Sequence, residues 1–129
     1  MRVHRNLRVD AGAPRQARET VDPLRNELGH ETVELLRLVL SELTTNCIQH
    51  GRADSGISVT VESTTTDQVH IEVGCASGVS QPQIVRAGYR GGAGGLGLRL
   101  VDQISTDWGV RNQNGRTIVW ADGWTSHVK

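Results

Sequence analysis

The segment ETVELLRLVLSELTTNCIQHG, residues 31–51, gives the clearest structural signal in the chain. Apolar side chains recur in it three or four positions apart, which is the spacing of one face of an amphipathic helix. This stripe consists of Leu36, Val39, Leu40, Leu43 and Cys47. Gly51 is suited to end the helix, because glycine readily adopts the conformation of a C-terminal cap. The segment therefore predicts a long helix with one buried face.

Strand patterns follow this helix. Apolar and polar residues alternate in ISVTVEST (57–64) and in VHIEV (69–73), as they do in strands with one buried face. The short turn between them predicts an antiparallel hairpin. A second hairpin is expected in DWGVRNQNGRTIVWADGW (107–124), with its turn at Asn114-Gly115, because Asn-Gly favours the tight turns of hairpins.

The remaining elements complete a fold class. Residues 2–9 predict a first strand, residues 13–28 a helix that Pro23 interrupts, and residues 95–105 a helix that opens on glycines. Helices and antiparallel strands are thus segregated along the chain. This order is typical of an α+β two-layer sandwich, in which helices cover one face of a mostly antiparallel sheet. The length of 129 residues suits a single domain, 1–129.

The composition argues against several classes of protein. Hydrophobic residues make up 36%, and 14 basic residues balance 14 acidic ones, so the chain lacks the signature of intrinsic disorder. Neutrality also argues against direct binding of nucleic acid through bulk charge. No stretch approaches the ~18–20 apolar residues that span a membrane, and the first residues lack the apolar region of a secretory signal. A cytoplasmic protein without membrane contacts is expected.

The two cysteines carry no recognisable motif. Cys47 and Cys75 lie in apolar surroundings, with neither a CxxC pair nor a Cys/His spacing typical of zinc. We therefore expect reduced thiols rather than a disulfide framework or a metal site.

Polar residues within the long helix are the first candidates for chemistry. Glu42 and Asn46 are four positions apart, so they lie on one face, at the rim of the apolar stripe. A rim position removes the carboxylate and the amide partly from water, where both need partners. The alternative is an ordinary surface pair on an amphipathic helix.

A glycine cluster is the second candidate. Six glycines fall between residues 88 and 97, within an expected loop from Gly74 to about Gly94 that runs into the helix at 95. Loops of this length usually have a function, and unpaired amides at the start of a helix suit phosphate. A GxGxxG pattern is present, but no strand precedes it, so a Rossmann site is not supported. The alternative is a flexible surface loop followed by a helix start.

Together, these signals resemble the ATP-binding domain shared by gyrase-type ATPases, heat-shock chaperones and histidine kinases. The motif sequences are most similar to those of the bacterial anti-sigma-factor serine/threonine kinases. SELTTNCIQHG (41–51) resembles their N-box, GGLGLRLV (94–101) their glycine box, and DWGVRNQNGRTIVWAD (107–122) their closing hairpin. The resemblance implies a Bergerat-type fold and a regulator of transcription that binds ATP and Mg²⁺. Its partners would be an anti-sigma-factor antagonist, a sigma factor or both, and it would form a homodimer.

The resemblance also implies roles for residues. Asn46 would hold Mg²⁺, and Glu42 would be the general base that accepts the proton of a serine or threonine hydroxyl. Thr117 would lie near the adenine. The glycine box would hold the phosphates through Gly95, Leu96, Gly97 and Leu98. No motif decides which arginine, among Arg86, Arg90 and Arg99, would meet the γ-phosphate.

One position departs from the family pattern. The family has an aspartate that accepts a hydrogen bond from the adenine amino group, and Cys75 stands at the matching position. A thiol is a weak acceptor, and the loss corresponds to about 1.5–3 kcal/mol, a ten- to hundredfold fall in affinity. Two functions therefore stay open: an ATP-dependent protein kinase, or a degenerate protein-binding module with weak or no nucleotide binding. A fused histidine-phosphorylating enzyme is disfavoured at this length.

Overall fold

The long helix is present as α3, which spans His30–His50. The computed structural model describes residues 1–50, 56–65, 68–76 and 95–123. Every residue of the predicted stripe is buried, and so are three further side chains on the same side of α3: Thr32, Val33 and Thr44. Burying one leucine side chain stabilises a fold by about 1.5–3 kcal/mol, so this stripe anchors the helix layer.

The N-terminal part contains the predicted strand, β1 (Arg2–Leu7). The predicted helix over residues 13–28 is wrong in its continuity, because it is divided into three pieces: α1 (Ala13–Glu19), a 3-10 helix η1 (Asp22–Leu24) and α2 (Arg25–Leu28). Proline lacks an amide hydrogen and its ring clashes with the preceding turn, so Pro23 starts a new piece.

An ion pair fixes this region against α3. Asp22 Oδ1 accepts hydrogen bonds from Arg37 Nη1 at 2.6 Å and from Arg25 Nη2 at 3.2 Å. Arg37 Nη1 also donates to the carbonyl oxygen of Arg18 at 3.5 Å. The flank of α3 that carries Arg37 therefore faces α1 and η1.

Both predicted hairpins are present. The first consists of β2 (Ile57–Thr65) and β3 (Gln68–Ala76), and the second of β4 (Ser105–Gln113) and β5 (Arg116–Gly123). The five-stranded sheet has the order β1-β2-β3-β5-β4, and its pairings are antiparallel. Asn114 and Gly115 have φ of 54° and 77°, as the tight turn between β4 and β5 requires.

Strand β3 is longer than its sequence pattern predicts. The loop expected from Gly74 includes three residues, 74–76, that belong to β3 instead. Cys75 is paired with Ile57 of β2 on one side and with Thr117 of β5 on the other. Strand pairing on both sides keeps this stretch extended although its sequence is not alternating. The remainder of the expected loop lies outside the described residues.

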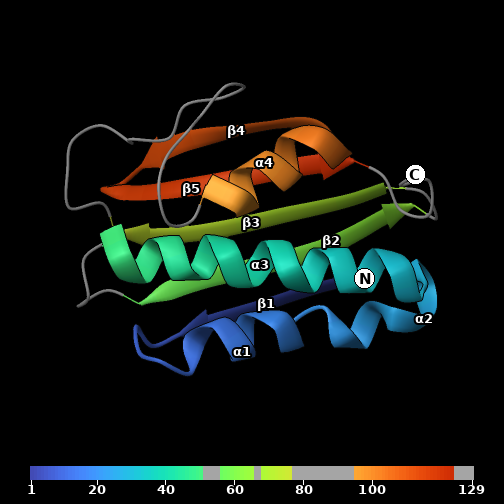
Figure 1. Cartoon of the computed structure of the whole chain (residues 1–129), viewed down its shortest axis with the longest axis horizontal. Coiled ribbons are helices and arrows are strands. Elements are labelled where there is room, and N and C mark those ends of the chain that lie inside the picture. The colour runs from blue at the N-terminus through green and yellow to red at the C-terminus, as the bar shows by residue number, and fades with distance from the viewer. Residues whose placement is uncertain (51–55, 66–67, 77–94, 124–129) are drawn as a thin grey trace.

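The predicted α+β two-layer sandwich is confirmed (Figure 1). Helices α1, α2, α3 and α4 (Gly95–Ile104) lie on one face of the sheet. The core between the layers combines the inward side chains of the strands with the stripe of α3; the strands contribute Val59, Val61, Ile71, Val73, Val119 and Ala121. In the described ranges, no helix is long and apolar enough to cross a membrane.

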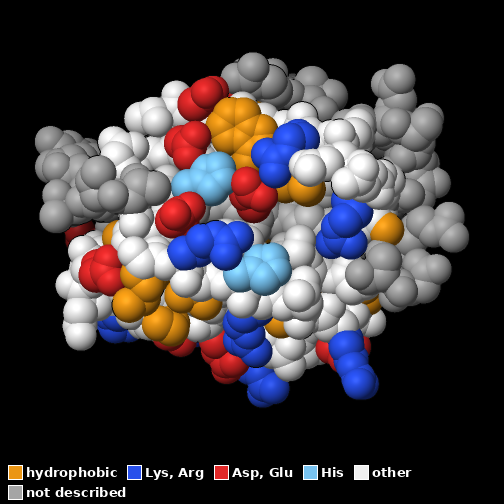
Figure 2. Space-filling model, turned by 180° about the vertical axis from the view of Figure 1, so that it is seen from behind, with side chains coloured by type: hydrophobic (Ala, Val, Ile, Leu, Met, Phe, Trp, Pro, Cys, Tyr) orange, Lys and Arg blue, Asp and Glu red, His pale blue; other side chains and the backbone are white. Residues whose placement is uncertain are grey.

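The opposite face of the sheet carries polar and charged side chains (Figure 2). His70 of β3 donates from Nδ1 to Asp122 Oδ1 at 2.5 Å and from Nε2 to Glu72 Oε2 at 2.8 Å. Glu72 also accepts a hydrogen bond from Arg111 Nη2 at 3.1 Å. Because carboxylates only accept hydrogen bonds, both contacts favour the protonated form of the His70 ring.

These contacts shift both titrations. Burial lowers the pKa of His70, but the hydrogen bonds and negative charges of Glu72 and Asp122 outweigh it, so the pKa is raised above 6.5. Burial raises the pKa of Glu72, but its contacts with His70 and Arg111 outweigh it, so the pKa is lowered below 4.5.

Candidate functional site

Two elements finish and two others begin on the same side of the molecule. Figure 1 shows the C-terminal end of α3, the end of β3, the start of β5 and the N-terminal end of α4 on that side. Helix α4 packs against α3 and against β4. The topology thus brings the C-terminal end of α3, the N-terminal end of α4 and the end of β3 together in one region.

Glu42 and Asn46 occupy the rim of α3, as their spacing predicts. Both are partly exposed, whereas the adjacent Leu43 and Cys47 are buried. Asn46 follows Arg37 by nine positions, which is about 180° around a helix. Since Arg37 faces α1 and η1, Asn46 lies on the opposite flank, and Glu42 lies one turn away on that flank. This is the side on which α4 packs.

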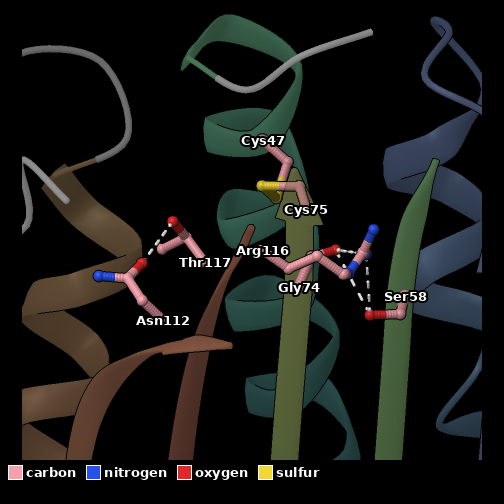
Figure 3. The surroundings of a disulfide bond; sticks show 7 residues. All are labelled: Cys47, Ser58, Gly74, Cys75, Asn112, Arg116 and Thr117. Atoms are coloured by element: carbon pink, nitrogen blue, oxygen red, sulfur yellow. Dashed lines mark hydrogen bonds between the residues drawn. A yellow bond between two sulfur atoms is a disulfide. The ribbon is translucent and has the colours of Figure 1, made fainter. Parts of the chain in front are cut away.

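The expectation of reduced thiols is wrong, because Cys47 and Cys75 form a disulfide (Figure 3). The bond joins α3 to the end of β3, with a Cα–Cα distance of 5.9 Å. The cysteines are 28 residues apart, and only the packing of α3 on β3 brings them together. A signal was present in the sequence, since Cys47 belongs to the helix stripe and Cys75 shares the inward face of its strand with Val73.

Cys75 has Thr117 as its direct neighbour on β5. The Thr117 hydroxyl donates to Asn112 Oδ1 of β4 at 3.1 Å, so it is held by the hairpin (Figure 3). Sequence reasoning did not identify Asn112, because its contact depends on the register of β4 and β5. Thr117 and the cysteine pair therefore border the same region.

A clamp on the other face of the sheet secures the end of β3. The carbonyl oxygen of Gly74 accepts hydrogen bonds from Arg116 Nη2 at 2.9 Å and from Ser58 Oγ at 3.4 Å (Figure 3). A Cβ on Gly74 would lie 2.9 Å from Ser58 Oγ, so a larger residue there would displace the Ser58 hydroxyl. The clamp fixes the strand position that precedes Cys75.

Helix α4 begins at Gly95, as predicted. The first amides of a helix have no intrahelical acceptor and point outward, so the backbone from 95 to 98 offers donors suited to an anion. The helix is anchored farther along, where Val101 is buried and Trp108 Nε1 donates to Asp102 Oδ1 at 2.8 Å. Arg99 is exposed on α4, and Arg86 and Arg90 lie outside the described residues.

The polar groups of this region suit the phosphates and Mg²⁺ of a magnesium nucleotide better than they suit its base. A carboxylate and an amide oxygen on the α4 side of α3, together with helix amides, suit Mg²⁺ and phosphate oxygens, because Mg²⁺ takes few protein ligands. At the end of β3, the disulfide offers only weak hydrogen-bond acceptors. The residues on the α4 side of α3 therefore suit phosphates and Mg²⁺ better than the disulfide suits a base.

Comparison with known proteins places these features in context. A family model described as "Histidine kinase-like ATPase domain" matches residues 8–122. A crystal structure of the RsbU and RsbW domains of Rv1364c from Mycobacterium tuberculosis superposes with a TM-score of 0.70 at 17% identity. The match covers 97% of this chain and 32% of that chain, so this chain spans about a third of its length and shares its fold. No curated protein matches the sequence.

Proposed function

Because the chain belongs to the histidine kinase-like ATPase domain family, we propose that it binds ATP with Mg²⁺ and transfers the γ-phosphate to a serine or threonine of a protein partner. The observation that carries the proposal is the position of Glu42 and Asn46 on the flank of α3 beside α4. The residues of the N-box and of the glycine box support the activity of an anti-sigma-factor kinase. An anti-sigma-factor antagonist is then the phosphate acceptor, and a sigma factor is the second partner.

Different groups of the site bind the metal ion and the phosphates. When bound, Mg-ATP supplies the phosphoryl group that is transferred. The amide oxygen of Asn46 is a hard ligand of the kind that Mg²⁺ prefers. The backbone amides of Leu96 and Leu98, near Gly95 and Gly97, donate to phosphate oxygens.

Glu42 orients the incoming hydroxyl and accepts its proton as the oxygen attacks. Catalysis of phosphoryl transfer rests mainly on positioning and on neutralisation of charge, so one carboxylate beside the phosphate donors is sufficient for the base.

A second function is favoured by one observation, the disulfide at Cys75. Without a carboxylate at that position, the chain would be a protein-binding module that sequesters a sigma factor through its surface. The two functions differ in whether nucleotide stabilises the protein, since a ligand that binds only the native state must raise its stability.

The test combines nucleotide binding with phosphate transfer. We expect Glu42→Gln to abolish transfer to the antagonist and to leave Mg-ATP binding within about twofold, because the carboxylate acts on the hydroxyl. Glu31→Gln makes the same change at an exposed position on α3 and is the matched control. Equal transfer by the two variants would exclude Glu42 as the base.

A further inference from the structure

The Cys47–Cys75 disulfide lies within the proposed nucleotide-binding site. Cys47 follows Asn46 directly on α3, and Cys75 occupies the strand position that the resemblance assigns to base recognition. Thr117, which the resemblance assigns to the adenine, is the neighbour of Cys75 on β5. The bond therefore connects the metal-binding segment to the base-binding end of the same site.

Oxidation changes both the space and the chemistry at this end. The bond holds the two Cα atoms 5.9 Å apart and ties α3 to the end of β3. A disulfide has no proton to donate and is a poor acceptor. After reduction, each side chain rotates independently and Cys75 presents a thiol that donates and accepts weakly.

The two sulfurs are not equally accessible. Cys47 is only 7% exposed, whereas Cys75 is partly exposed at the end of β3. Cys75 is therefore the expected point of attack by a reductant. Disulfides of cytosolic proteins are usually transient and redox-sensing, which agrees with a bond at a ligand site in a chain expected in the cytoplasm.

From these observations we propose that the Cys47–Cys75 bond is a redox gate on nucleotide binding. The oxidised protein binds Mg-ATP weakly, because the bond ties α3 to β3 at the base-binding end and leaves no thiol for the base. The reduced protein binds more tightly, because α3 and β3 separate locally and a thiol becomes available to the base. This inference rests on the proposed function and adds its regulation.

Opening of the gate requires a dithiol reductant of the thioredoxin class. One thiolate of the reductant attacks Cys75 Sγ, the disulfide breaks, and Cys47 leaves as a thiolate that takes up a proton. The second thiol of the reductant then displaces Cys75 from the mixed disulfide. Two electrons and two protons reach the protein, and the reductant becomes a disulfide.

The test uses the whole chain in both redox states. One sample is oxidised with oxidised glutathione and the other is reduced with dithiothreitol, and alkylation followed by mass measurement counts the free thiols. Isothermal calorimetry then measures Mg-ATP affinity in each sample. We expect at least a fivefold tighter dissociation constant in the reduced protein, as one recovered weak hydrogen bond would give.

A variant without the cysteines shows whether dithiothreitol changes the Mg-ATP affinity through the disulfide or in another way. Cys47→Ser combined with Cys75→Ser has no disulfide, so its affinity should not respond to dithiothreitol. In reduced wild-type protein, Mg-ATP should also slow alkylation of Cys75. This second readout is independent of calorimetry and does not require a folded variant.

The outcomes distinguish the two proposals. Equal affinity in both redox states, or tighter binding by the oxidised protein, overturns the gate and leaves the proposed function standing. Failure to bind Mg-ATP in either state and in the double variant overturns both. Two alkylated thiols in the sample treated with oxidised glutathione also overturn the gate.

Discussion

Cys75 and Thr117 lie directly opposite each other where β3 pairs with β5, at the end of β3 that is closed by a disulfide to α3. A carboxylate at position 75 would sit beside the threonine hydroxyl and serve as an acceptor for a base amino group. This pairing makes the proposed base-binding end of the site testable.

Replacement of Cys75 by aspartate should strengthen ATP binding. A charge-assisted hydrogen bond is stronger by about 1.5–3 kcal/mol, which is ten- to hundredfold in affinity. Cys75→Ser is the matched control, because it also removes the disulfide but adds no charge. Calorimetry with Mg-ATP measures both variants, and equal affinities would place base recognition elsewhere.

Asn46→Ala should weaken binding of ATP in the presence of Mg²⁺ by about tenfold and have little effect in its absence, because the amide oxygen proposed as the Mg²⁺ ligand is removed. Asn26→Ala, at an exposed position of α2, is the control. Titrations with and without Mg²⁺ measure the difference. An equal loss in both conditions would mean that Asn46 contacts the nucleotide itself.

The disulfide should also stabilise the fold. It closes a loop with a sequence separation of 28 residues, and such a cross-link stabilises by about 3–4 kcal/mol through the unfolded chain. Urea unfolding of oxidised and reduced protein measures this difference. Coincident unfolding curves would show that the cross-link contributes nothing.

Thr44→Val should raise stability by about 1 kcal/mol. Thr44 is fully buried, and its hydroxyl has no hydrogen-bond partner in the described part of the chain, so valine removes an uncompensated polar group. Thr45→Val is the control, because its hydroxyl donates to the carbonyl oxygen of Ser41 at 2.8 Å and that bond is lost. Destabilisation of Thr44→Val as large as that of the control would contradict this interpretation.

The charged network on the open face predicts a dependence of stability on pH. The raised pKa of His70 contributes stability that is complete below 6.5 and is lost as pH rises through the folded value. The lowered pKa of Glu72 contributes stability that is complete above 4.5 and is lost as pH falls through the folded value. The network therefore stabilises most between pH 4.5 and 6.5.

His70→Gln tests this dependence. Urea unfolding from pH 4 to 9 should show the largest difference from the wild type inside that window, by at most about 1 kcal/mol per pair because the groups are partly exposed. The difference should shrink at alkaline pH. His30→Gln, at an exposed position of α3, serves as the control. A difference that grows as pH rises would contradict the raised pKa.

Local patterns in the sequence predict much of this fold. The stripe of α3, the alternation in β2 and the Asn114-Gly115 turn each depend on neighbours in the chain, and all are present. Glu42 and Asn46 also lie at the rim of α3, because a helix fixes the angle between its side chains.

Features that depend on docking were not predictable in this way. The disulfide requires the contact of α3 with β3, and the His70 contact with Asp122 requires the register of β3 against β5. Cys75 extends β3 only because both neighbouring strands pair with it. Hence the surroundings of Cys75 were the part of the candidate site that the sequence described least well.

We expect Mg-ATP to bind between the rim of α3 and the start of α4. Calorimetric titration of the reduced full chain with Mg-ATP tests it most directly. We expect saturable heat with one nucleotide per chain, and binding about tenfold weaker in the Asn46→Ala variant. No heat and no thermal stabilisation at millimolar nucleotide would contradict it.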